Sequence, residues 1–113
     1  MVRAEWLEES GVYNLNIYED GERAALGRLT VRDSVCKIAY MVVFSEHRGK
    51  KYGDFLMRLL IRRAYELGCR EQYVDIPAEL VDFFKKYEFQ VTGPAGGGCL
   101  RLRREGDITG DCE

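Results

Sequence analysis

The sequence predicts an α+β fold, in which a mixed, mostly antiparallel central sheet packs against helices in the order β-β-β-α-β-α-β. The first part of the chain alternates apolar and polar residues between short turn signals, as half-buried strands do. A long amphipathic pattern over residues 52–67 then predicts a helix. A further strand pattern after that helix indicates a crossover connection between two parallel strands.

Three strands joined by short turns come first. Residues 12–18 alternate apolar and polar side chains, and Asp20-Gly21 is a strong hairpin signal. Residues 24–31 form the returning strand, and Asp33-Ser34 forms the next turn. Residues 35–44 are almost continuously apolar, so we expect a central strand that is covered on both faces. These three strands should form an antiparallel meander.

Two helices and a strand follow the meander. Apolar residues recur at spacings of three and four from Tyr52 to Leu67, and Gly68 is suited to end this helix. Residues 72–76 predict a short strand that Pro77 ends. Residues 78–87 then carry the apolar pattern of a second helix.

The C-terminal part is richer in glycine. We expect a strand to begin at residues 89–91, a flexible loop over 93–98 and a final strand over 99–103. Residues 105–113 are polar and predict a frayed tail. The length of 113 residues and the lack of a linker indicate one domain over residues 1–113.

The charge and composition exclude several classes of protein. The net charge is −2, which argues against a general nucleic-acid-binding protein. The charge is uneven, because residues 48–63 are basic and both ends of the chain are acidic, so a small anionic ligand is favoured. No apolar run is long enough to span a membrane, and residues 1–10 do not resemble a signal peptide, so we expect a cytoplasmic protein.

The cysteines and the single histidine argue against a metal site. The four cysteines are widely spaced, with no CxxC pair, and a structural zinc site is therefore not expected. In a cytoplasmic protein they should be reduced thiols. They are Cys36, Cys69, Cys99 and Cys112.

The most informative segment is VVFSEHRGKKYG, residues 42–53, which joins the central strand to the long helix. The first amides of a helix have no partner within the helix, and the helix dipole favours an anion there. Glycines at 49 and 53 allow a ligand close to the main chain, and Arg48, Lys50 and Lys51 add positive charge. The segment therefore predicts a seat for a phosphate or pyrophosphate group.

This segment and the order of elements resemble the GNAT superfamily of acyl-CoA-dependent N-acetyltransferases. The family motif is Arg or Gln, two residues, Gly, one residue, then Gly or Ala, and here Arg48 and Gly53 hold its ends, with Lys51 in place of the middle glycine. FFKKYEF, residues 83–89, resembles the later FYEKLGF segment of the family. The family usually begins with a strand and two helices, so the chain resembles a minimal, N-terminally short member.

The resemblance implies acetyl-CoA, or coenzyme A, as the cofactor. The main chain at the end of the central strand would line the pantetheine arm, and the amides of the basic turn would hold the pyrophosphate. The implied cofactor-binding residues are Met41, Val42, Val43, Arg48, Gly49, Lys50, Lys51, Tyr52 and Gly53. The acyl thioester would lie between the central strand and the strand at 72–76, and the amine would enter from the opposite side.

The candidate catalytic residues are fewer than the family leads one to expect. The tyrosine that often protonates the thiolate is replaced by Phe84, so Tyr87, one turn later, is the candidate acid. The central strand carries no carboxylate, so Asp75 on the next strand is the first candidate base. Glu46 and His47, in the turn just before the phosphate loop, come next, and the ordinary pKa of His47 suits proton transfer near neutral pH. Tyr13, Tyr18 and Tyr40 could line an acceptor pocket.

Three functions remain open from the sequence. The first is an N-acetyltransferase (an acyltransferase, in the transferase class) that acetylates a primary amine of a small molecule, a protein lysine or an N-terminus. The second is a catalytically weak acyl-CoA-binding or regulatory module, and the third keeps the fold without the cofactor. In the family, the N-terminal helices usually cover part of the acceptor site, so a member without them should have an open site. An open site favours a large acceptor, or completion of the site by a homodimer or a partner subunit. The acidic ends of the chain could attract a basic acceptor, and neither a nucleic acid nor a membrane is expected as a partner.

Overall fold

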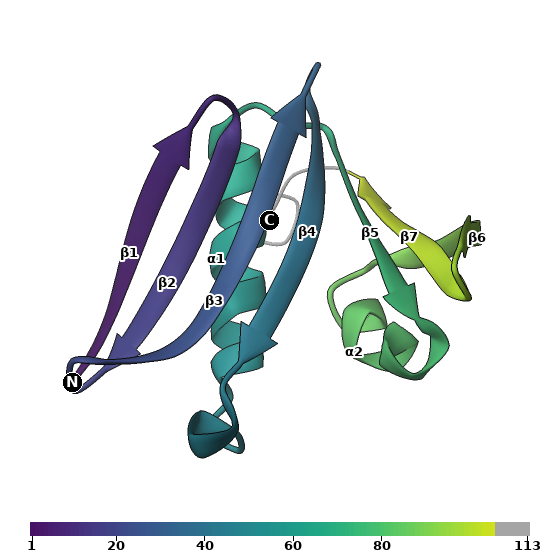
Figure 1. The fold of residues 1–113 in the computed structure, drawn as a ribbon. Coiled ribbons are helices and arrows are strands. Elements are labelled where there is room, and N and C mark those ends of the chain that lie inside the picture. The colour runs from purple at the N-terminus through teal and green to yellow at the C-terminus, as the bar shows by residue number, and fades with distance from the viewer. Residues whose placement is uncertain (106–113) are drawn as a thin grey trace, which may run out of the picture.

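One seven-stranded sheet with two helices forms the fold in the computed structural model, which describes residues 1–105 (Figure 1). The strands lie in the order β1-β2-β3-β4-β5-β7-β6, and all neighbours are antiparallel except β4 and β5. The strands are β1 (Val2–Glu9), β2 (Val12–Glu19), β3 (Glu22–Arg32), β4 (Val35–Val43), β5 (Glu71–Pro77), β6 (Gln90–Gly96) and β7 (Cys99–Glu105). The helices are α1 (Tyr52–Glu66) and α2 (Val81–Lys85), with 3-10 turns at Ser45–His47 and Ala78–Leu80. The mixed, mostly antiparallel fold predicted from the sequence is confirmed.

The N-terminal residues form an additional strand, β1, that the sequence pattern does not reveal. β1 pairs with β2 along its whole length, from Val2 opposite Glu19 to Glu9 opposite Val12. Ser10 and Gly11 join the two strands with φ of 51° and 81°, as in a tight hairpin turn. Charged residues on both faces of β1 hide the alternation, since this edge strand buries only part of one face.

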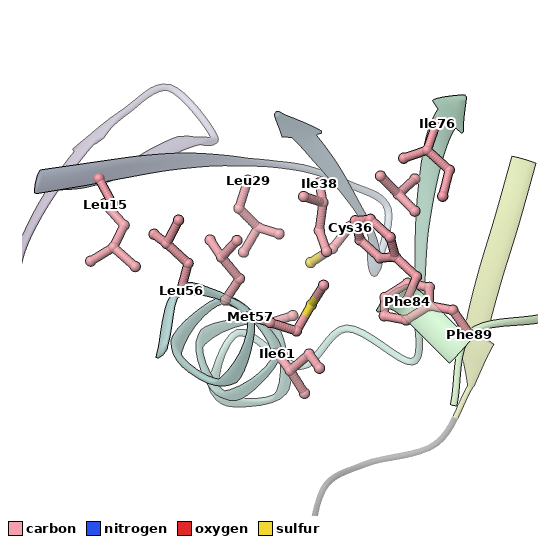
Figure 2. Close-up of a cluster of buried hydrophobic side chains, with 14 of the residues drawn as sticks. Leu15, Leu29, Cys36, Ile38, Leu56, Met57, Ile61, Ile76, Phe84 and Phe89 are labelled. Carbon is pink, nitrogen blue, oxygen red and sulfur yellow. The ribbon is translucent and has the colours of Figure 1, made fainter. Parts of the chain in front are cut away.

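The hydrophobic core lies between the sheet and α1 (Figure 2). Leu56 and Leu60 of α1 are fully buried and meet Leu15 and Leu29 of the neighbouring strands in one cluster. The cluster continues to Phe84 of α2, which packs on the same side of the sheet as α1. Among the described residues, no helix covers the opposite face of β2, β3 and β4, which we call the open face (Figure 1).

Gly27 of β3 is the point of closest approach between the sheet and α1. A Cβ atom built at Gly27 would lie 3.2 Å from Leu60 Cδ1 and 3.4 Å from Leu56 Cδ2. Such distances are tight for fully buried side chains that have little room to move.

Gly27→Val is therefore expected to lower the free energy of unfolding by about 1–3 kcal/mol, because it forces α1 away from the sheet. Urea unfolding of the variant beside Thr30→Val, which places a valine on the open face of the same strand with almost no change in volume, checks this expectation. Equal stabilities of the two variants would show that α1 does not pack closely on Gly27.

The C-terminal hairpin differs from the sequence prediction. Residues 93–96, expected in a flexible loop, belong to β6, and only Gly97 and Gly98 turn the chain. The register of β6 against β7 shifts at Val91/Gly93 and at Pro94/Gly96, so the irregular residues are absorbed as bulges of an edge strand. Glu105, expected in the frayed tail, is the last residue of β7, and residues 106–113 lie outside the described residues.

The second helix is shorter than the pattern predicted. Residues 78–80 form a 3-10 turn, and regular α-helix covers only Val81–Lys85. Glu88, with φ of 71°, turns the chain so that Phe89 enters the core. Of the described helices, none is both long and apolar enough to cross a membrane.

Cys36 and Cys69 form a disulfide, so the prediction of reduced thiols is wrong for this pair. The return of the chain after α1 brings Cys69 beside the start of β4, with a Cα–Cα distance of 6.1 Å. Sequence spacing could not show this proximity, because the two residues are brought together by the crossover. Cys99 is a free thiol, and Cys112 lies outside the described residues.

Candidate functional site

A gap between β4 and β5 forms the centre of the candidate site. The two strands pair only from Val35 opposite Glu71 to Lys37 opposite Tyr73, and beyond that point they diverge (Figure 1). A cavity of about 340 Å³ lies where they diverge. Its lining residues are Ile38, Ala39, Tyr40, Met41, Val43, Gly53, Val74, Asp75, Ile76, Pro77, Leu80, Phe83 and Phe84.

A bulge in β4 opens this cavity to both faces of the sheet. Leu29 is opposite Ile38 and Arg28 is opposite Tyr40, so Ala39 is an extra residue without a partner on β3. Ile38 points into the core beside α1, whereas Tyr40 is 38% exposed on the open face. Because the lining includes residues of both faces, the cavity connects the α1 side with the open face.

The start of α1 adjoins the cavity through Gly53. The residue before the helix, Lys51, makes no side-chain hydrogen bond to the helix end, and the first backbone bond runs from Phe55 N to Lys51 O, at 3.2 Å. The amides of the first turn are therefore not capped by that side chain and point toward the end of the helix, where they can bind an anion. The structure thus places backbone amides that can bind an anion beside an apolar cavity.

Lys51 stands where the family motif that residues 48–53 resemble has its middle glycine. It adopts the backbone conformation that glycine favours. Its φ is 67° and its ψ is 26°, in the left-handed region. A residue with a Cβ atom is disfavoured there by about 1–2 kcal/mol.

We expect Lys51→Gly to be more stable than Lys51→Ala by about 1 kcal/mol, because only glycine removes the backbone strain. The two variants lose the same charge, so the comparison isolates the conformation. Thermal or urea unfolding measures the difference, and a more stable alanine variant would contradict the expectation.

Two cations of the turn are bound by other parts of the chain. Arg48 Nε donates a hydrogen bond to the carbonyl oxygen of Val43, at 3.1 Å, which ties the turn to the end of β4. Lys50 Nζ lies 2.9 Å from Glu19 Oε1. This hydrogen bond, together with one from His47, lowers the pKa of Glu19. Lys50 is therefore directed toward the β2–β3 hairpin.

A second cavity, of about 430 Å³, lies beside the start of α1 and carries three further cations. Lys51, Arg58 and Lys86 line it together with Phe55, Tyr87 and Asp54. Lys51 was predicted from the sequence as an anion-binding residue, whereas Arg58 and Lys86 were not. The helical spacing of Arg58 from Lys51 could have indicated the first of them, whereas Lys86 directly follows α2.

His47 lies outside the central cavity and inside a cluster of carboxylates. It is 5% exposed, with Nδ1 2.7 Å from Glu19 Oε1 and Nε2 3.2 Å from Glu22 Oε1. Each ring nitrogen therefore contacts the carboxylate of a different glutamate. The contacts tie the 3-10 turn before the basic loop to the β2–β3 hairpin, and they give no support to a role in proton transfer.

Tyr87 also lies away from the central cavity. Its hydroxyl donates a hydrogen bond to Asp54 Oδ1 in the first turn of α1, and its ring lines the second, basic cavity. The bond joins the turn after α2 to the start of α1. The geometry therefore favours a part in shaping the basic cavity over the protonation of a thiolate.

Asp75 is the sequence-predicted catalytic residue that does line the central cavity. Its two carboxylate oxygens accept hydrogen bonds from Arg101 Nε and Nη2, at 2.8 and 2.9 Å, and Lys37 Nζ lies 3.9 Å away. The hydrogen bonds from Arg101 lower the pKa of Asp75, which makes it a weaker base. Neither cation was recognised from the sequence as part of the site.

The Asp75–Arg101 pair should make the free energy of unfolding fall as the solution becomes acidic. Because the pKa of Asp75 is lowered from 3.8 in the folded protein, its stabilising contribution is full above about pH 3.8 and is lost as the pH falls further. Urea unfolding between pH 3 and pH 6 should show a smaller acid-induced loss for Arg101→Gln than for the unchanged protein. Arg32→Gln, at an exposed position, should behave as the unchanged protein does, and an equal acid loss in all three would contradict the assignment.

Comparison with known proteins decides the family. The profile described as the acetyltransferase (GNAT) family matches residues 2–89, most of the chain. The chain belongs to the GNAT acetyltransferase family. This assignment confirms the resemblance stated from residues 48–53 and 83–89. No curated protein matches the sequence significantly.

Solved GNAT structures share the fold at low sequence identity. A Bacillus subtilis acetyltransferase in complex with CoA has a TM-score of 0.78 and 15% identity, over 93% of this chain and 99% of that chain. The ribosomal-protein-S18-alanine N-acetyltransferase of Escherichia coli has a TM-score of 0.78 and 13% identity, over 88% and 72% of the two chains. The PaiA N-acetyltransferase of Thermoplasma acidophilum, in complex with coenzyme A, has a TM-score of 0.77 and 15% identity. That match covers 85% of this chain and 62% of the Thermoplasma chain.

Proposed function

We propose that this GNAT protein is an acetyl-CoA-dependent N-acetyltransferase that transfers an acetyl group to a primary amine. The observation that carries the proposal is the cavity between β4 and β5, which adjoins the uncapped start of α1 through Gly53. An apolar channel that ends at free helix amides matches the two parts of coenzyme A, a slender pantetheine arm and a pyrophosphate.

The residues present fit this cofactor. The walls of the central cavity are mainly apolar and can receive the pantetheine arm beside the backbone of Met41 and Val43. The amides from Gly49 to Gly53 can bind the pyrophosphate, and the basic cavity at Arg58 and Lys86 can receive the phosphorylated adenosine. CoA-bound structures of the Bacillus and Thermoplasma relatives support the same cofactor here.

The chain offers positions for each chemical task of the transfer. When bound, acetyl-CoA would supply the acetyl thioester, whose C–S bond breaks as the C–N bond forms. We propose that Asp75 orients the amine and receives its proton, directly or through water, on the open face. Tyr40 lines the same cavity and Tyr87 does not, so we propose Tyr40 rather than Tyr87 as the group that protonates the departing thiolate. Positioning of the two substrates across the sheet supplies much of the remaining rate.

Calorimetric titration with acetyl-CoA and with CoA tests the proposal. We expect micromolar binding that falls at least tenfold in Arg48→Ala, because the basic turn loses a cation and its tie to β4. Arg62→Ala, an exposed change farther along α1, is the matched control and should bind as the unchanged protein does. An absence of binding by the unchanged, folded protein would refute the proposed function.

A second candidate function is a catalytically weak acyl-CoA-binding or regulatory module. Two observations favour it: Phe84 replaces the family tyrosine, and Asp75 is already engaged by Arg101. A panel of simple amines, assayed for release of free thiol, separates the candidates. Binding of acetyl-CoA without acceleration over buffer would favour the module, whereas turnover that is lost in Asp75→Asn and reduced in Tyr40→Phe would favour the enzyme.

We also propose that a second copy or a partner subunit completes the acceptor side, since no described helix covers the open face. Sedimentation velocity over a range of concentrations tests for a homodimer, and a monomer at high concentration would leave only a different partner subunit. A cytoplasmic location stays a prediction from the sequence.

A further inference from the structure

The open-face mouth of the central cavity carries more positive than negative charge. Tyr40 and Asp75 line the cavity at this mouth, and three cations contact them. Arg28 stacks on the ring of Tyr40, with its guanidinium carbon 5.1 Å from the ring centroid. Arg101 and Lys37 both approach Asp75. Three cations and one carboxylate leave two positive charges in excess, in a protein whose net charge is −2.

Two of these cations retain unused hydrogen-bonding capacity. Arg28 donates from Nε to Asn14 Oδ1, at 2.9 Å, and within residues 1–105 no carboxylate lies within 4 Å of its guanidinium. Lys37 Nζ is 3.9 Å from Asp75 Oδ2, beyond hydrogen-bond distance, and its side chain is 39% exposed. Arg101, by contrast, already binds both oxygens of Asp75.

The bulge in β4 places these two cations on the same side of the mouth. Lys37 and Tyr40 are successive open-face residues of β4, because Ile38 points to the core and Ala39 is the bulged residue. Arg28 lies opposite Tyr40 on β3. A carboxylate near the ring of Tyr40 would therefore meet positive charge from both strands.

We propose that this mouth, which we call the cationic mouth (Arg28, Lys37, Tyr40, Asp75 and Arg101), selects an acceptor that carries a carboxylate as well as its amine. The inference rests on the proposed acetyl transfer at the same cavity. The surplus charge attracts the carboxylate, repels a purely cationic polyamine and favours the amine in its uncharged, nucleophilic form. Arg28 and Lys37 bind the carboxylate, while Asp75 faces the amine.

A carboxylate-bearing acceptor differs from the basic acceptor that the acidic ends of the chain suggested. The acidic residues of the N-terminal end, such as Glu5, Glu8 and Glu9, lie on β1, and β2 and β3 separate that strand from β4. Those at the C-terminal end, Asp107, Asp111 and Glu113, lie outside the described residues. Among the described residues, the charge beside the cavity is therefore mainly positive.

Three amines of equal chain length test the inference: 4-aminobutanoate, butylamine and 1,4-diaminobutane. We expect kcat/KM for 4-aminobutanoate to exceed that for butylamine by about tenfold, and 1,4-diaminobutane to be the poorest. Lys37→Gln and Arg28→Gln should each raise KM for 4-aminobutanoate several-fold and leave the Kd for acetyl-CoA unchanged. Arg32→Gln, on the exposed end of β3, is the control and should retain the preference.

The carboxylate that binds at the cationic mouth could also belong to the acyl group. The transfer from succinyl-CoA to butylamine is therefore measured as a separate experiment. A preference for succinyl-CoA over acetyl-CoA, lost in Lys37→Gln and without any preference among the amines, would place the carboxylate on the acyl chain and overturn the inference. Equal kcat/KM for the three amines with acetyl-CoA would also overturn it, while leaving the proposed transfer intact. If acetyl-CoA does not bind, the proposed transfer and the inference both fall.

If acetyl-CoA binds without turnover, binding of butanoate and of butylamine to the CoA-loaded protein is compared by saturation-transfer NMR. A stronger butanoate signal that Lys37→Gln reduces would support the cationic mouth in a protein with little catalysis. Equal signals would overturn the inference.

Discussion

Replacing Gly53 with alanine should stabilise the free protein and weaken acetyl-CoA binding by about tenfold or more. Gly53 is the second residue of α1, where glycine is less favourable than alanine by about 0.5–1 kcal/mol. A Cβ atom there would meet Phe83 at 3.6 Å, an ordinary contact, so the folded chain can accept it. The added methyl group would, however, stand where the apolar cavity meets the first amides of the helix.

Urea unfolding and calorimetric titration of Gly53→Ala check whether stability rises while acetyl-CoA binding weakens. Gly68→Ala is the control, because Gly68 has φ of 81° and follows the far end of α1. That variant should lose stability, and its affinity for acetyl-CoA should not change. Gly53→Leu should weaken binding further, since its side chain reaches into the cavity. An alanine variant that binds acetyl-CoA as tightly as the unchanged protein would show that the main chain at Gly53 does not contact the cofactor.

Phe89→Ala should lower the free energy of unfolding by about 3–5 kcal/mol, the largest loss of stability that we expect from a single change. Phe89 is 1% exposed, and its ring lies edge-on to that of Phe84, with 5.5 Å between the ring centroids. The truncation leaves a cavity beneath α2 and removes the support of Phe84, which lines the gap between β4 and β5.

Urea unfolding of the variant measures this loss, with Val91→Ala as the control. Val91 is 43% exposed on the edge strand β6, so its truncation should change stability by less than about 0.5 kcal/mol. A loss below about 1 kcal/mol for Phe89→Ala would mean that α2 is not anchored by this side chain. Phe89→Leu keeps most of the volume and should fold well enough for acetyl-CoA binding to be measured.

Local patterns predicted most elements of the fold because each carries its own signal. The strands of the meander alternate or are continuously apolar, and Asp20-Gly21 turns the chain with φ of 52° and 86°. α1 begins at Tyr52, as its apolar spacing predicts. β1 and β6 were missed or misplaced because edge strands bury little, so charge and glycine are tolerated in them.

The candidate site was predictable in its backbone part and less so in its side chains. The turn around Gly49 and the start of α1 are local features, and the structure has them at the predicted positions. His47 and Tyr87 were selected for their chemistry, but residues distant in sequence, Glu19 and Asp54, bind them. Partners at such sequence separations depend on which strands and helices become neighbours.

By itself, then, the sequence determined the type and order of most elements, the basic turn at the start of α1 and the family to which the chain belongs. These follow from interactions between residues close together along the chain, which periodicity and turn chemistry record. The tertiary structure alone decided the width of the gap between β4 and β5, the Cys36–Cys69 bond and the sign of the charge around Asp75. Each of these depends on contacts of β4, β5, β7 and the segment between α1 and β5, and pairing across a sheet is set by the packing of the whole chain.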